Sequence, residues 1–409
     1  MKRYIFIIIV ILLLVSCKNI SEEAMSHQEV EEDIEYFLKT LDTHPLVSEK
    51  PELARELNEF VYSEIKDSIT EKNLYFIVSK ALSQINDAHT MIDIYSQDFR
   101  AVDFRVKWLE DGLFIISDGQ MFSKGDKILK VGNKSINEVL NDFSKVLSVE
   151  NENRLKFLIE QLLPTKMYLE YLNVINEDGT VTFKIMNIEG EESNIKLRFN
   201  TRYNLLDKHY KDIFDNPYYY DIDSENKVGV YYLNQCLYND EFKKSVGEFF
   251  NEVNKLDIRK IAIDVRRNPG GDSRAILEIV KYLEYDQVVN LNQSIKSINK
   301  SGISYDGDIY ILVSKETFSS GNGLAGVFKY NNLGILVGGA TGNSTKAYGN
   351  TISFTLPNSK IMYNIATKKI LIPVNGSHSN TIKPDINIKV NIDDILSKRD
   401  PVIKWLKYE

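Results

Sequence analysis

Two short segments in the second half of the chain carry residue types suited to acyl transfer. The first is residues 263–273, Ile-Asp-Val-Arg-Arg-Asn-Pro-Gly-Gly-Asp-Ser, in which a strand of the buried type runs into a double-glycine turn. Glycine permits backbone conformations that turn amide N–H groups outward, and such amides can hold an oxyanion. Gly270 and Gly271 are therefore candidate oxyanion-hole residues, although an ordinary strand-to-helix turn has the same composition.

The second segment is residues 313–323, Val-Ser-Lys-Glu-Thr-Phe-Ser-Ser-Gly-Asn-Gly. Here a buried strand ends and Ser319 opens a helix, where the helix dipole and free N–H groups stabilise negative charge. Ser319 is thus the candidate nucleophile, with Ser320 as the alternative. Both could equally be helix N-caps, which is the commonest role of serine at that place.

The elements that must position these segments alternate between strand and helix. Short strands are predicted at 228–233, 261–265, 309–313 and 335–337, and helices near 240–256, 273–284 and 321–331. This alternation predicts an α/β core with a mostly parallel sheet and helices packed on it. We assign the core to residues 205–409, beginning with a tyrosine-rich connector at 205–226.

The first half of the chain has a different pattern. Residues 27–100 are predicted to be helical because apolar residues recur at helical spacing. Residues 101–204 are predicted to form a β-rich unit with a helical insertion near 151–172. Within it, residues 124–136 resemble the middle of a PDZ domain, which implies binding of an extended peptide tail at a sheet edge. A generic hairpin would show the same pattern.

Taken in order, these motifs resemble those of the tail-specific (C-terminal processing) and tricorn-core serine peptidases. The order is Asp-Ala-His-Thr at 87–90, the PDZ-like unit, the double-glycine turn, Thr-Phe-Ser-Ser at 317–320, Val-Gly-Gly-Ala-Thr-Gly at 337–342 and Lys-Pro-Asp-Ile at 383–386. The resemblance extends over about residues 30–395. It implies a serine-type endopeptidase that cleaves proteins or peptides through an acyl-enzyme and needs no metal and no organic cofactor.

The resemblance assigns roles by position. It makes Ser319 the nucleophile, in place of the serine of the family's Ala-Ser-Ala-x-Glu run, and Asn322 stands where that run has its glutamate. It implies an oxyanion hole formed by the backbone N–H of Ser320 together with that of Gly270 or Gly271.

A serine nucleophile needs a base within hydrogen-bond reach. The processing peptidases of the family use a lysine 25 residues after the serine, where this chain has Ser344; Lys346 stands two residues later. The tricorn-like branch uses a histidine from the His-Thr element instead, which is His89 here. Imidazole is suited to proton transfer near neutral pH. The alternative for His89 is a histidine placed at a helix C-terminus by the helix dipole.

The group that orients this base departs from the family pattern. The branch's closing element often carries a glutamate six residues before its proline, and counting back from Pro384 leads to His378. Asp87 and Asp385 are the carboxylates that could substitute, and His378 and Lys346 remain accessory candidates.

The N-terminus has the layout of an export signal. Lys2 and Arg3 precede an apolar run at 4–15 that is short for a membrane span, and Leu-Val-Ser-Cys at 14–17 resembles a bacterial lipobox. The resemblance implies a signal peptide at 1–17, lipidation of Cys17, a tether at 18–26 and a body outside the cytoplasm, anchored to a bacterial membrane. The alternative is a retained N-terminal anchor helix. With Cys17 lipidated, Cys236 has no disulfide partner and is expected to be a buried thiol.

Composition is that of a folded globular protein. Of the 409 residues 43% are hydrophobic. The net charge is −8 and the sequence has no block of basic residues, so a nucleic-acid partner is not expected. The expected function is therefore peptide-bond hydrolysis by Ser319 with His89 as base. Two alternatives stand beside it, a catalytically inactive lipoprotein that binds peptide tails and an esterase or other acyl transferase using the same serine. The oligomeric state is not indicated.

Overall fold

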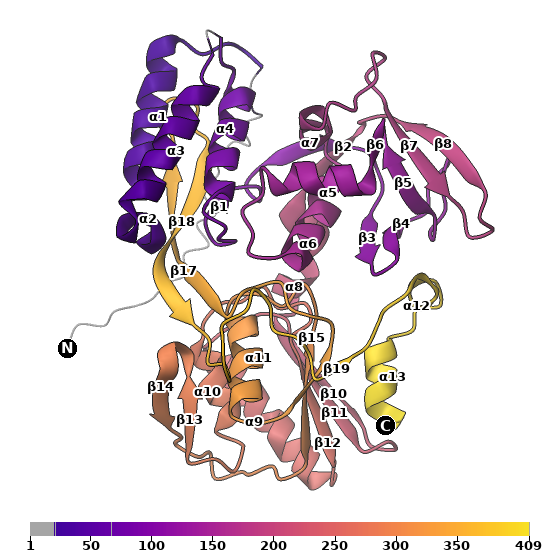
Figure 1. Ribbon diagram of the computed structural model, residues 1–409. Helices are drawn as coiled ribbons and strands as arrows, with labels where there is room; N and C mark the ends of the chain where they lie inside the picture. Colours follow the sequence, from indigo (N-terminus) through magenta and orange to yellow (C-terminus); the bar gives the residue numbers. More distant parts are fainter. Residues whose placement is uncertain (1–19, 21, 67, 409) are drawn as a thin grey trace.

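The computed structural model describes residue 20, residues 22–66 and residues 68–408. The predicted signal peptide, its lipidation site Cys17 and part of the predicted tether lie outside these described residues. Within the described ranges no helix is long and apolar enough to cross a membrane. Figure 1 shows an upper half, with helices α1–α4 beside a β-rich unit, above a lower half built on a single sheet.

Four helices begin the described chain, and local capping signals set where two of them start. Ser26 and Glu29 form a capping box at the start of α1, and Thr70 and Asn73 form one at the start of α4. On one face of α1, Val30, Ile34 and Phe37 lie in the core and Leu38 packs against it. The bounds are α1 His27–Leu41, α2 Pro45–Glu49, α3 Pro51–Glu64 and α4 Glu71–Ser83.

The β-rich unit follows, and six of its strands form one sheet. Its strands pair in the order β3-β4-β5-β7-β8 with β6 on β5, while β2 pairs with β9 beside it. Its buried side chains form one core with those of α1–α4, so the boundary predicted near residue 100 does not separate two hydrophobic cores. The bounds are β1 Met91–Ile92, β2 Asp98–Ala101, β3 Val106–Leu109, β4 Gly112–Ile115, β5 Lys127–Val131, β6 Lys134–Ser135, α5 Ile136–Ser144, α6 Glu152–Leu162, α7 Lys166–Tyr171, β7 Val181–Met186, β8 Glu192–Leu197 and β9 Thr201–Asn204.

The lower half contains the predicted α/β core. Six strands lie in the order β10-β11-β12-β15-β16-β19, and all neighbours from β11 to β19 are parallel. Strands β11, β12, β15 and β16 are the four that the sequence predicts. The tyrosine-rich connector differs from expectation because part of it forms β10, which pairs antiparallel with β11. The bounds are η1 Leu206–Tyr210, α8 Lys211–Asp215, β10 Tyr218–Asp223, β11 Val228–Leu233, β12 Lys260–Asp264, β15 Asp308–Val313, β16 Ile335–Gly338 and β19 Ile386–Asn387.

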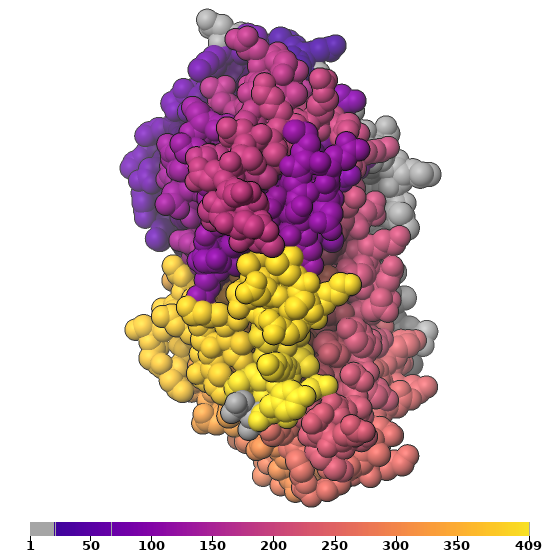
Figure 2. Space-filling model, turned by 90° about the vertical axis from the view of Figure 1, so that its right-hand side faces the viewer, coloured from indigo at the N-terminus to yellow at the C-terminus, as the bar shows by residue number. Residues whose placement is uncertain are grey.

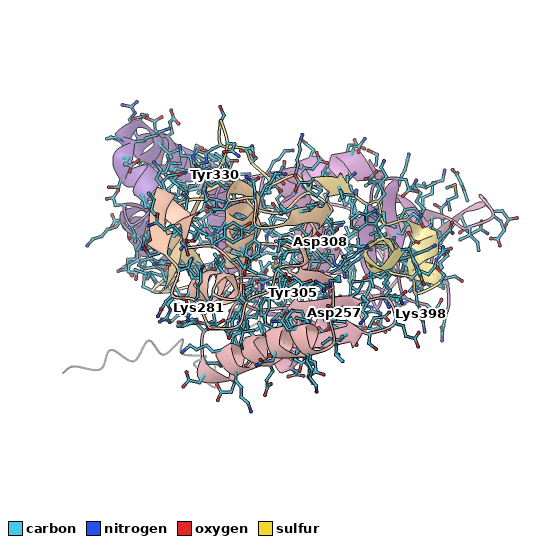
Figure 3. The ribbon with its side chains drawn as sticks, turned by 90° about the horizontal axis from the view of Figure 1, so that it is seen from below. Asp257, Lys281, Tyr305, Asp308, Tyr330 and Lys398 are labelled. Atoms are coloured by element: carbon cyan, nitrogen blue, oxygen red, sulfur yellow. The ribbon has the colours of Figure 1, made fainter. Side chains whose placement is uncertain are left out.

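Helices cover both faces of this sheet. Side chains of α9, α10 and α11 form a core against one face, and Val402 and Leu406 of α13 pack on the other. The bounds are α9 Asp240–Lys255, α10 Arg274–Val280, β13 Gln287–Asn290, η2 Leu291–Gln293, β14 Ser294–Ser297, α11 Ser320–Tyr330, α12 Ile392–Leu396 and α13 Pro401–Tyr408. Figure 3 looks onto the lower end of the molecule, where β15 begins at Asp308 and α11 ends at Tyr330. The parallel strands therefore direct their carboxyl ends toward the upper half.

A long hairpin that the sequence did not predict joins the two halves. Its strands are β17 Lys346–Thr355 and β18 Met362–Leu371. It leaves the lower half and extends along the helices α1–α4 (Figure 1). There β1 pairs with β18, with Met91 opposite Asn364, and Ala366 N donates to Thr90 Oγ1 at 2.9 Å. The hairpin thereby ties the segment that precedes β1 to the lower half.

The C-terminal segment makes a second connection. Figure 2 shows it, in yellow, lying across the boundary between the upper and lower halves. Lys124 of the β-rich unit donates through Nζ to the carbonyl oxygen of Ile395 at 2.8 Å. Contacts of this kind restrict the movement of one half relative to the other.

A cluster of four charged residues makes a third connection. Glu160 of α6 contacts both Lys315 and Lys107, and Lys107 also pairs with Glu316. Glu160 is only 5% exposed, and its Oε1 accepts a hydrogen bond from Trp108 N at 2.5 Å. The cluster links the β-rich unit to the residues just before Ser319.

Replacing Glu160 with glutamine is expected to lower the free energy of unfolding by about 3 kcal/mol or more, because two lysines lose a buried counter-charge. The measurement is urea denaturation followed by circular dichroism. Glu152→Gln is the matched control, since Glu152 lies on the same helix, is 61% exposed and pairs with Lys156 at the surface, where such a pair contributes less than about 1 kcal/mol. Equal midpoints for the two variants would contradict the role given to the cluster.

Candidate active site

Ser319 occupies a strained turn between β15 and α11. It is the N-cap of α11, with φ 51° and ψ −121°, a backbone conformation that non-glycine residues rarely adopt and that costs on the order of 1–3 kcal/mol. The position places its side chain at the positive end of the helix dipole. The sequence prediction that Ser319 opens this helix is confirmed.

Hydrogen bonds join the Ser319 turn to the double-glycine turn. Thr317 Oγ1 donates to the carbonyl oxygen of Val265 at 2.8 Å, and Phe318 N donates to that of Asn268 at 2.9 Å. Ser320 Oγ donates to the carbonyl oxygen of Gly271 at 2.7 Å. The Ser320 hydroxyl therefore holds the two turns together.

Neither Gly270 nor Gly271 could carry a side chain without a clash. Gly270 has φ 111°, and a Cβ on it would lie 2.5 Å from Ser319 Cβ and 2.9 Å from Ser319 Oγ. Gly271 has φ 128°, and a Cβ there would lie 2.2 Å from the carbonyl oxygen of Cys236. The double-glycine turn thus lies close enough to Ser319 for its backbone to contact a substrate group that is bonded to Ser319 Oγ.

The amides of these turns differ in what they bond. Gly270 N donates to Asn268 Oδ1 at 2.7 Å, so this amide is already engaged. Among the described residues, the amides of Gly271 and Ser320 have no acceptor. They are the better pair for an oxyanion, and Gly270 supports them by its conformation.

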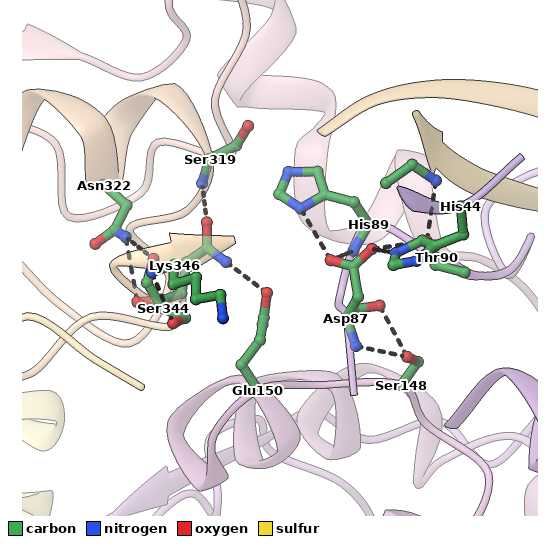
Figure 4. Close-up of polar contacts among 12 residues, drawn as sticks. His44, Asp87, His89, Thr90, Ser148, Glu150, Ser319, Asn322, Ser344 and Lys346 are labelled. Atoms are coloured by element: carbon green, nitrogen blue, oxygen red, sulfur yellow. Dashed lines mark hydrogen bonds and ion pairs between the residues drawn. The ribbon is translucent and has the colours of Figure 1, made fainter. Parts of the chain in front are cut away.

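His89 lies opposite Ser319, on the segment between α4 and β1. Its ring stacks on that of Phe318, with centroids 4.5 Å apart, and its side chain is 12% exposed. Neither ring nitrogen has a hydrogen-bond partner among the described residues. His89 and Ser319 line the same cavity of about 970 Å³, and Figure 4 shows the His89 ring between Ser319 and Asp87.

Asp87 is the carboxylate behind the histidine. It is fully buried, and its Oδ1 lies 3.7 Å from His89 Nδ1 and accepts a hydrogen bond from His89 N at 3.2 Å. Thr90 Oγ1 donates to Oδ2 at 2.6 Å. Burial raises the pKa of Asp87, but the hydrogen bond from His44, the His89 ring 3.7 Å away and the hydrogen bond from Thr90 outweigh it and hold the pKa well below its usual range. Asp87 is therefore an ionised group facing the imidazole.

His44 completes this network, although its place in the N-terminal region offered no signal for it. It is fully buried and contacts Asp87 Oδ2 through Nε2 at 3.2 Å. Leu46 N donates to His44 Nδ1 at 3.2 Å, so the ring hydrogen resides on Nε2 and His44 donates to Asp87. His44 thus holds Asp87 as an acceptor.

Glu150 reaches the site from the loop before α6 and was not a sequence candidate. Its Oε1 accepts a hydrogen bond from Asn343 Nδ2 at 2.8 Å, and Asn343 Oδ1 accepts one from Ser319 N at 3.1 Å. Its Oε2 is buried without a hydrogen-bond partner among the described residues. Burial and the charge of Asp87 raise the pKa of Glu150 to about 8.

The accessory candidates do not line the cavity that Ser319 and His89 share. His378 is exposed, and its Nδ1 contacts Thr345 Oγ1 at 3.2 Å. Lys346 is exposed at the start of β17. Asp385 pairs with Lys329 at 2.6 Å in the lower half. None of the three is among the residues that line the cavity with Ser319.

Two further positions from the sequence comparison have structural contacts. Asn322, at the position of the family's glutamate, donates through Nδ2 to the carbonyl oxygens of Asn343 and Ser344 at 3.1 Å. Cys236 is buried as predicted, and burial raises the pKa of its thiol to about 12. It is therefore a poor nucleophile.

Comparisons with known proteins converge on one family. The model of peptidase family S41 matches residues 227–388, which hold both turns of the site. A carboxyl-terminal-processing protease from Picosynechococcus sp. is 32% identical over 139 residues, an alignment that covers 31% of this chain and 32% of that protein. The chain thus aligns with about a third of the length of this curated relative.

Solved structures extend the likeness of fold beyond the matched segment. Mature CPAF, solved in complex with lactacystin, has a TM-score of 0.67 at 13% identity, with 93% of this chain and 97% of that chain covered. A putative peptidase from Parabacteroides merdae has a TM-score of 0.53 at 14% identity, with 93% and 97% covered. The α/β fold of this chain is therefore shared with known structures over most of its length.

Proposed function

We propose that the chain is a peptidase of family S41, whose model matches residues 227–388, and that it acts as an endopeptidase in which Ser319 attacks the peptide carbonyl with His89 as base. One observation carries the proposal. Ser319 and His89 line one cavity, and an ionised, buried Asp87 lies on the far side of the imidazole. This is the arrangement of nucleophile, base and orienting carboxylate that acyl transfer needs.

The reaction follows from the positions of these groups. Because His89 Nδ1 faces Asp87, Nε2 is the nitrogen that takes the proton from Ser319 Oγ as Oγ bonds to the carbonyl carbon. The amides of Gly271 and Ser320 hold the resulting oxyanion. Breaking the C–N bond transfers the proton from His89 to the leaving amine, and water then hydrolyses the acyl-enzyme by the same steps.

Ser319 and His89 are not hydrogen-bonded to each other in the structure, and the proposal does not require that they are. Catalytic hydrogen bonds are often long before substrate binds and shorten in the complex. Both ring nitrogens of His89 lack other partners among the described residues, so no competing bond has to break. Lys346 is exposed and outside the cavity lining, which favours histidine over the lysine of the processing peptidases.

The test is covalent labelling of the purified ectodomain, residues 26–409, with a fluorophosphonate. We expect one adduct per chain, located by mass spectrometry on the peptide that contains Ser319, together with cleavage of an unfolded protein substrate. A chain that acquires no adduct under conditions that label a known serine peptidase would support the inactive, tail-binding alternative. Labelling without peptide cleavage but with hydrolysis of simple esters would support the esterase alternative.

Export and anchoring are also part of the proposal. The charged start, the apolar run and Cys17 support a lipid-anchored protein whose catalytic body lies outside the cytoplasm. The PDZ-like unit would then present substrate tails to the cavity. Expression of the full chain with Cys17→Ser should move the protein from the membrane fraction to the soluble fraction. An unchanged membrane fraction would favour the retained anchor helix.

A further inference from the structure

Glu150 connects the histidine-bearing segment with the serine-bearing turn. On one side one of its carboxylate oxygens lies within 4.8 Å of a His89 ring nitrogen and of an Asp87 oxygen. On the other it accepts the hydrogen bond from Asn343, whose Oδ1 holds Ser319 N. His89 and Ser319 are 230 residues apart in sequence, and the Glu150 carboxylate reaches toward both segments. Figure 4 shows Glu150 reaching up toward the site from the loop below.

The carboxylate is also close to the base. A carboxylate oxygen of Asp87, a ring nitrogen of His89 and a carboxylate oxygen of Glu150 lie within 4.8 Å of one another. Glu150 Oε2 is buried and has no hydrogen-bond partner among the described residues. An unpartnered carboxylate oxygen is costly to bury, so its retention beside the imidazole calls for a function.

Three charged or titratable groups set the environment of Glu150. Asp87 repels a charge on it, Arg154 attracts one, and His89 gains a proton during the reaction. The carboxyl group is neutral below its pKa of about 8 and ionised above it. The charge on Glu150, beside His89, therefore changes near pH 8, where kinetic measurements on the folded protein are practical.

We propose that Glu150 is a positioning residue that holds the Ser319 turn through Asn343 and, when ionised, stabilises the His89 imidazolium that forms as Ser319 is acylated. The inference rests on the proposed function of Ser319 and His89. It supplies the second carboxylate that the chain lacks at position 378, where the family's closing element often has a glutamate and this chain has His378.

The proton balance is simple. The proton of Ser319 Oγ passes to His89 and later to the leaving amine, so Glu150 neither gains nor loses one during the cycle. Its contribution is electrostatic, because an anion within about 4–6 Å of an imidazolium favours the charged form. Above pH 8 the ionised Glu150 lowers the barrier to acylation, and below pH 8 the neutral acid keeps only its hydrogen bond to Asn343.

The experiment measures the second-order rate constant of Ser319 labelling by a fluorophosphonate between pH 6.5 and 9. Glu150→Gln retains an oxygen that can accept from Asn343 but cannot ionise. We expect wild type and this variant to react at similar rates at pH 6.5 and wild type to be faster by about tenfold at pH 9. Glu152→Gln, two residues away on the surface, should follow the wild-type profile.

Two further results complete the test. Asn343→Ala should lower the rate at every pH, because it releases Ser319 N, but its rate should still rise more between pH 6.5 and 9 than that of Glu150→Gln, because Glu150 can still ionise. Parallel pH profiles for wild type and Glu150→Gln would overturn the electrostatic role of Glu150, whatever their absolute rates. A wild-type chain that is not labelled at any pH would instead contradict the proposed function itself, so the two failures are distinguishable.

Discussion

Ser319→Ala is expected to lower kcat for peptide hydrolysis by about 10⁶-fold and to abolish fluorophosphonate labelling. The magnitude is that found when the nucleophile of a serine peptidase is removed, because the remaining groups cannot act without it. Substrate binding should change little, since the side chain contributes only a hydroxyl to a cavity of about 970 Å³. The measurement is turnover of a fluorogenic peptide by the purified chain of residues 26–409.

Ser320→Ala is the matched control for this variant. Its hydroxyl donates to the carbonyl oxygen of Gly271 and lies next to the nucleophile in sequence, but its backbone amide is untouched by the substitution. We expect this variant to keep its labelling at Ser319 with a modest loss of rate. Full activity in Ser319→Ala together with loss of activity in Ser320→Ala would transfer the nucleophile to Ser320.

His89→Gln is expected to have an effect of similar size, about 10⁶-fold in kcat, because nucleophile and base act as a unit. Glutamine fills much of the same space against Phe318 but cannot take the serine proton at neutral pH. The rate of labelling should fall with kcat, since acylation by the probe needs the same base. KM should change little.

His378→Gln is the control for the base. His378 is exposed, and its contact is with Thr345 rather than with the cavity. Its replacement should leave kcat near the wild-type value. A small effect of His89→Gln combined with a large effect of His378→Gln would reverse the assignment, and a large effect of Lys346→Met would return the site to the lysine mechanism.

The sequence was most informative where function depends on local conformation. A double glycine after a buried strand and a serine at a helix start are patterns of neighbouring residues, so the turn at Gly270 and the elbow at Ser319 could be predicted from their own segments. The four parallel strands were predicted for the same reason, since a run of buried-type residues between helices has few alternatives. The site residues predicted in these two turns lie together in the structure.

Residues that meet the site from elsewhere were not predictable in this way. His44 and Glu150 have no motif around them, and each acts only through a partner distant in sequence. The hairpin β17–β18 was missed because its strands alternate weakly, and because the pairing of β18 with β1 joins segments far apart in the sequence. The position of Asp385 was not predictable either. Its ion pair with Lys329 removes it from the candidates for orienting the base.

The sequence by itself determined the chemistry available to this protein: a serine at a helix start, outward-facing amides and a histidine of the right type. Only the tertiary structure decided which carboxylate stands behind that histidine. Asp87 was one of two candidates; it is the one that lies beside His89, and hydrogen bonds from His44 and Thr90 keep it ionised despite its burial. The physical reason is that residue type and local conformation depend on residues that are neighbours in the sequence. Burial, the charge state of a side chain and the distances between side chains are set only when segments far apart in the chain pack together.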